Sequence, residues 1–173
     1  MQPTHRSNRI LQPAKTWFIH FSLLVALTLN YVPTGRLVGV PDWVAVVLMF
    51  WCIREPARVG MGVALVVGVL VDIGHGAALG QHALAYVVLA YLASAVARRV
   101  LWFPSPQQAL QILPLLLLSQ GIMVGVRLLA GAEFPGWAYF VSSFTSALLW
   151  MPASFLLLLP QYQPVERDEN RPI

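Results

Sequence analysis

Six apolar stretches, separated by short polar or glycine- and proline-rich segments, make up most of this chain. They cover residues 17–32, 43–53, 60–73, 81–97, 108–129 and 137–159. A helix that crosses a bilayer needs about 20 mostly apolar residues, so the second and third stretches are short. The pattern predicts an all-α integral membrane protein with six transmembrane helices, of which the second and third are short.

The second stretch is preceded by Pro41 and Asp42, two residues that are typical of the first turn of a helix. A helix over residues 42–53 is about 18 Å long, whereas the hydrocarbon core is about 30 Å thick. Two explanations stay open. Either residues 37–40 complete the crossing without helical structure, or the helix is buried against its neighbours.

The composition supports a membrane protein, because 58% of the residues are hydrophobic and only 10% are charged, against about 25% charged in soluble domains. The net charge of +4 comes from basic residues spread along the loops. No basic cluster interleaved with aromatic residues is present, so membrane lipid is expected as a partner and nucleic acid is not. The single cysteine, Cys52, excludes an intrachain disulfide.

The positions of lysine and arginine predict the orientation. With six crossings and a cytoplasmic N-terminus, nine of the 11 basic residues are cytoplasmic and two, Arg36 and Arg127, are outside. The nine are Arg6, Arg9, Lys15, Arg54, Arg58, Arg98, Arg99, Arg167 and Arg171. Cytoplasmic segments of membrane proteins are enriched in these residues. We therefore expect cytoplasmic tails at residues 1–15 and 161–173 around a six-span membrane domain at residues 16–160.

Residues 60–80 carry the most distinctive pattern, in which small residues recur every four positions together with one acid. The series is Gly60, Ala64, Gly68, Asp72, Gly76 and Gly80. Its first three members share one face of a helix and form a smooth groove that lets another helix approach closely. The neighbour is expected to belong to this chain rather than to a partner.

Asp72 lies about 18 Å along this helix from Gly60, within the hydrocarbon, where a carboxylate needs a partner. One interpretation is a proton or ligand site. The favoured interpretation is that Asp72 accepts backbone N–H bonds and caps the turn at residues 74–80. A metal site with His75 and His82 lacks a fourth ligand, so neither a metal nor a cofactor is predicted.

Other polar and aromatic residues have simpler interpretations. Arg127 could pair with Glu133 or Asp72, or extend to lipid headgroups. The serines of the last stretch, Ser143 among them, are interpreted as packing residues. Tryptophans are expected to anchor the helices at the membrane interfaces; they are Trp43, Trp51, Trp102, Trp137 and Trp150. Catalytic motifs such as a nucleophile elbow, a phosphate-binding loop or H-E-x-x-H are absent from the sequence, so an enzyme is not expected.

Residues 41–91 follow a recognisable order: a glycine-bearing helix, an aspartate, a glycine turn, Leu-Gly and a helix of small residues. The residues that define this order are Pro41, Asp42, Trp43, Arg58, Gly62, Gly68, Val71, Asp72, Gly76, Leu79, Gly80, Leu84 and Tyr86. In these residues the chain resembles the bacterial rod shape-determining protein MreD family.

The resemblance implies a non-enzymatic inner-membrane subunit of the cell-wall elongation complex, which scaffolds peptidoglycan synthesis and regulates cell shape. It implies association with MreC, MreB, RodA and a class B penicillin-binding protein. The family is also similar in outline to the substrate-binding subunits of vitamin transporters. A small-molecule transporter subunit is therefore the alternative function, and a proton relay centred on Asp72 is a further one.

Overall fold

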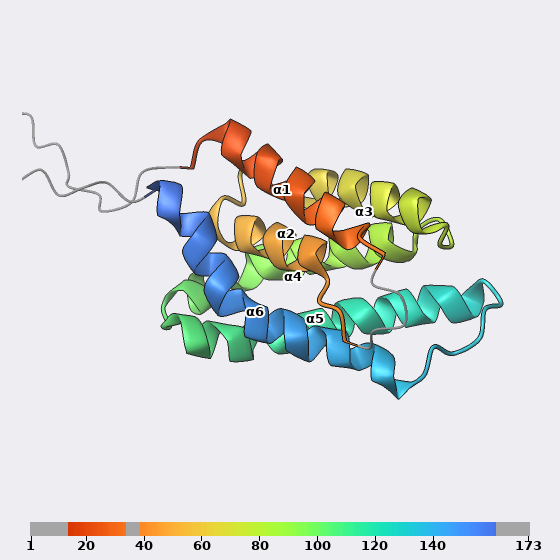
Figure 1. The fold of residues 1–173 in the computed structure, drawn as a ribbon. Coiled ribbons are helices and arrows are strands. Elements are labelled where there is room, and N and C mark those ends of the chain that lie inside the picture. Colours follow the sequence, from red (N-terminus) through yellow and green to blue (C-terminus); the bar gives the residue numbers. More distant parts are fainter. Residues whose placement is uncertain (1–13, 34–38, 162–173) are drawn as a thin grey trace, which may run out of the picture.

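The computed structural model describes residues 14–33 and 39–161, and all regular elements in these ranges are helices (Figure 1). The six α-helices are α1 (Thr16–Asn30), α2 (Trp43–Arg54), α3 (Met61–His75), α4 (Gln81–Leu101), α5 (Ser105–Leu129) and α6 (Val141–Leu158). Two short 3-10 helices, η1 (Trp137–Phe140) and η2 (Leu159–Gln161), flank α6. The predicted all-α fold with six helices is confirmed for the described part of the chain.

Helix α2 forms the centre of the bundle, with α1, α4 and α6 packed around it (Figure 1). Every residue from position 44 to position 53 is buried except Val47. A helix of 12 residues is long enough here because it is enclosed by protein. Of the two explanations for its shortness, the structure shows burial; residues 37 and 38 lie outside the described residues.

Helices α3 and α4 form a hairpin whose turn depends on two glycines. Gly76 ends α3 with a left-handed φ of 60°, and the next residue donates its N–H to the carbonyl of Asp72 at 3.0 Å. Gly80 begins α4 with a φ of 98°. Residues with a side chain rarely adopt such angles, so these glycines allow α3 to stop and α4 to start within five residues.

Three segments are long and apolar enough to cross a membrane, namely Gln81–Leu101, Ser105–Leu129 and Trp137–Gln161. Helices α1, α2 and α3 are apolar but shorter. Large apolar side chains such as Leu148 and Phe155 of α6 are exposed on the outside of the bundle. An apolar outer surface of this kind is compatible with a surrounding lipid bilayer.

The two ends of the bundle differ in charge. The described chain begins and ends at the same end, where the α2–α3 and α4–α5 connections also lie (Figure 1). The opposite end holds the α3–α4 turn and the α5–α6 loop, with Arg127 beside it. The remaining described lysines and arginines lie at or near the first end; they are Lys15, Arg54, Arg58, Arg98 and Arg99. The predicted tails lie outside the described residues, apart from residues 14, 15 and 161.

Two tryptophans are core residues rather than anchors. Trp51 is 0% exposed and donates from its indole N–H to Ser22 Oγ at 2.8 Å. Trp150 is 2% exposed and donates to Gln108 Oε1 at 3.1 Å. The prediction of interface anchors is wrong for these two, because position along an apolar stretch does not reveal which side of the helix faces the core. Trp102 and Trp137 are exposed.

Candidate functional site

Asp72, fully buried near the end of α3, holds the start of α4. Its carboxylate accepts backbone N–H bonds from Gly80 at 2.9 Å, His82 at 2.8 Å and Ala83 at 3.3 Å. The first N–H groups of a helix have no partner within the helix, and Gly80 has no side chain to cap them. Asp72 therefore acts as the N-cap of a neighbouring helix, and its charge lies at the positive end of that helix.

His82 completes the set of partners of Asp72. Its Nδ1 lies 2.8 Å from Asp72 Oδ1, and because a carboxylate only accepts, this nitrogen carries the proton. His75 stacks on His82 with ring centroids 5.8 Å apart, but its two nitrogens face the carbonyls of Val71 and Asn30 at 3.2 Å each. In the described ranges no three His, Cys, Asp or Glu side chains gather to hold a metal ion.

Asp42, which is half-buried, links three helices through a second set of polar contacts. It caps α2 by accepting from the N–H of Ala45 at 3.0 Å, and its own N–H donates to Ser146 Oγ in α6 at 3.0 Å. The hydroxyl of Tyr86 in α4 lies 2.9 Å and 2.8 Å from the two carboxylate oxygens and donates its proton to them. His82 and Tyr86 are one turn apart in α4, with ring centroids 5.9 Å apart. Both aspartates therefore form hydrogen bonds with residues of α4.

Replacing Tyr86 with phenylalanine is expected to lower the free energy of unfolding by about 1 to 3 kcal/mol, because the Asp42 carboxylate loses a donor inside the bundle. Tyr91→Phe is the matched control. Tyr91 lies in the same helix, is 58% exposed and has no side-chain hydrogen bond to the described residues. The measurement is the melting temperature of each purified variant in detergent, and equal temperatures for both variants would contradict the prediction.

The three small residues of the α3 groove have different surroundings. Gly68 lies directly against α4, since a Cβ there would be 2.5 Å from Ala83 Cα and 2.7 Å from Ala83 N. Ala64 is buried. Gly60 is the N-cap of α3, and a Cβ there would find only Pro56 O, at 3.8 Å. Close approach of a neighbouring helix therefore occurs at Gly68, and the neighbour is α4 of the same chain.

A second layer of buried polar groups lies between α5 and α6. Ser143 donates to Gln120 Oε1 at 2.6 Å. Ser119 Oγ is buried and has no partner among the described atoms, and it borders a small cavity of about 10 Å³ beside Asp42. The interpretation of Ser143 as a packing residue is incomplete, because it also forms a hydrogen bond between helices. The sequence holds no signal for this pairing beyond the presence of polar residues in apolar stretches.

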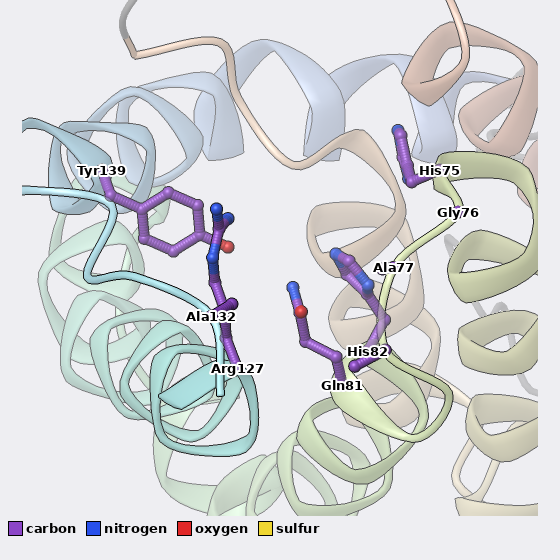
Figure 2. A pocket seen from close by; sticks show the side chains of 9 residues that line it. His75, Gly76, Ala77, Gln81, His82, Arg127, Ala132 and Tyr139 are labelled. Atoms are coloured by element: carbon purple, nitrogen blue, oxygen red, sulfur yellow. The ribbon is translucent and has the colours of Figure 1, made fainter. Parts of the chain in front are cut away.

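A cavity of about 500 Å³ opens at the bundle end that holds the α3–α4 turn (Figure 2). Its walls come from this turn, the start of α4, the end of α5 and η1. Arg127 lines it with a buried Nε that has no partner in the described part of the chain. Neither Glu133 nor Asp72 forms an ion pair with Arg127. The cavity, which sequence reasoning missed, can accept a polar ligand.

The family model described as rod shape-determining protein MreD matches residues 9–161 of the chain. The chain belongs to the MreD family. It is also 29% identical to the rod shape-determining protein MreD of Haemophilus influenzae over 149 residues, which cover 82% of this chain and 89% of that protein. No solved structure matches.

Membership in the MreD family confirms the resemblance predicted from residues 41–91. It supports a role in determining rod shape, and together with the three long apolar helices it supports a membrane protein. The description of the family names cell shape and no reaction. The comparisons do not favour the transporter alternative.

Proposed function

We propose that this chain is a non-enzymatic inner-membrane subunit of the cell-wall elongation complex that scaffolds peptidoglycan synthesis. Family membership over residues 9–161 carries the proposal. The buried Asp72 and the half-buried Asp42 are consistent with it, since both are held by hydrogen bonds that join helices. The proposed partners are MreC, MreB, RodA and a class B penicillin-binding protein. The bundle is proposed to be surrounded by membrane lipid.

The proposed topology has six crossings with both termini in the cytoplasm. Two observations support it: the described chain starts and ends at one end of the bundle, and the basic residues gather there (Figure 1). Helices α1 and α3, with 15 residues each, are about 22 Å long. Local thinning of the bilayer beside short helices accommodates such lengths.

Affinity purification from native membranes tests the proposed partners. A tagged copy of the chain, solubilised in mild detergent, is expected to co-purify with wall-synthesis proteins detected by mass spectrometry. A second multi-pass protein with the same tag serves as the control for nonspecific recovery. Recovery of a transporter ATPase without any wall-synthesis protein would contradict the proposal and support the transporter alternative.

Depletion of the chain tests the role in cell shape. Rod-shaped host cells are expected to widen and round, and wild-type protein supplied in trans is expected to restore their width. Cells that keep their width after complete depletion would contradict the role.

A further inference from the structure

Two side chains with hydrogen-bond donors that have no partner among the described residues, Gln81 and Arg127, meet in the cavity beside the α3–α4 turn. Gln81 is only 7% exposed, and its side-chain amide has no hydrogen bond to any described residue. Figure 2 shows this amide between His82 and Arg127, directed into the same space. The amide atoms of Gln81 are not enclosed by the described residues, so a ligand in the cavity can form hydrogen bonds with them.

Arg127 supplies the other donor. The guanidinium of Arg127 is permanently charged, and its Nε is buried and unpaired in the described structure. His82 also lines the cavity, but its Nδ1–H donates to Asp72, so its Nε2 is an acceptor in this tautomer. His75 contributes a stacked ring, because its nitrogens already face backbone carbonyls.

The electrostatics of the cavity favour an anion. Asp72 is the acid nearest to His82, but its oxygens are already bound by the N–H groups of α4 and by His82. Glu133, in the α5–α6 loop, is exposed and does not pair with Arg127.

We propose that this cavity binds a phosphate group, carried either by a small soluble organic phosphate or by a phospholipid headgroup. Its volume of about 500 Å³ exceeds that of a single ion and lies in the range of sites for small organic ligands. The oxygens of a phosphate can accept from a guanidinium and an amide at once, whereas the arginine fork alone satisfies a carboxylate. The α3–α4 turn, which lines the cavity, lies at an end of the bundle (Figure 1), and lipid headgroups surround the ends of a membrane-spanning bundle.

The test measures binding to the full chain purified in a phosphate-free detergent. Glycerol phosphate and short-chain phosphatidylglycerol are titrated separately by calorimetry, with acetate and a short-chain diacylglycerol as controls. One or both phosphate compounds are expected to bind and to raise the melting temperature. Arg127→Gln and Gln81→Glu are each expected to raise the Kd about tenfold or more, the loss expected for one hydrogen bond to a charged group.

The variants are chosen to keep the fold. Gln81→Glu preserves the shape of the side chain, and an acid in the first turn of α4 is favoured by the helix dipole. Arg127 has no ion pair to lose among the described residues. Arg98→Gln is the matched control, because it removes the same charge from an exposed position at the other end of α4. Its Kd is expected to equal that of the wild type.

Each possible result of these titrations either supports or overturns the proposed phosphate site. Binding of glycerol phosphate that depends on Arg127 and Gln81 assigns a soluble ligand, and binding of phosphatidylglycerol alone assigns a headgroup. No binding of either compound, wild-type affinity in both variants, or equal binding of acetate would overturn the proposal. The scaffold function would survive that result, because its partners and its effect on cell shape are measured independently.

Discussion

Asp72→Ala is expected to reduce strongly the amount of folded protein that can be recovered. The substitution removes the acceptor of three backbone N–H groups and of His82 Nδ1 at a position with 0% exposure. Leaving a buried N–H donor without an acceptor costs about 1 to 3 kcal/mol, and an ordinary domain is stable by only about 5 to 15 kcal/mol. The loss is expected as a much lower recovery of monodisperse protein in detergent and a lower melting temperature.

Asp72→Asn separates the contributions that the shape and the charge of the Asp72 side chain make to stability. Asparagine keeps the size of the side chain and one acceptor oxygen, but its NH₂ group faces N–H donors of α4. Its stability is expected to lie between those of the wild type and Asp72→Ala. Glu133→Gln is the control, since it neutralises an exposed loop acid. If Asp72→Ala melts at the wild-type temperature, the capping role assigned to this carboxylate is wrong.

Gly68→Ala is expected to destabilise the protein, although alanine is the better helix former. The new Cβ would lie 2.5 Å from Ala83 Cα and 2.7 Å from Ala83 N. Backbone atoms cannot rotate away as a side chain can, so α3 and α4 must separate, and overpacking of this kind costs about 1 to 3 kcal/mol or more. Gly68→Leu is expected to cost more still. Thermal melting in detergent measures the effect.

Gly62→Ala provides a control of opposite sign in the same helix. A Cβ at Gly62 meets nothing within 4 Å, so the substitution is expected to stabilise α3 by up to about 1 kcal/mol. The two variants share the same chemical change and differ in what lies beside the residue. A loss of stability in Gly62→Ala equal to that in Gly68→Ala would refute close α3–α4 packing as the cause.

Part of the candidate site could be predicted from local sequence. The spacing of Asp72 among glycines indicates a capped turn, because only glycine readily adopts the backbone angles seen at Gly76 and Gly80. Which N–H groups the carboxylate binds was not predictable, since the same residues fit either a cap of the turn or a ligand site. The contact of Tyr86 with Asp42 spans 44 positions, and no periodicity links two residues so far apart.

The sequence by itself determined the class of the protein, the number of its helices and its family. The length of the apolar stretches, the scarcity of charged residues and the spacing of the glycines are local properties of the sequence. They can therefore be recognised without knowledge of the fold. Only the tertiary structure decided that α2 is enclosed, that Trp51 and Trp150 are core residues, and that Gly68 faces α4. It alone brought Gln81, His82 and Arg127 to one cavity. The physical reason is that in a uniformly apolar helix every face looks alike in sequence, so packing against the other helices decides which side is buried.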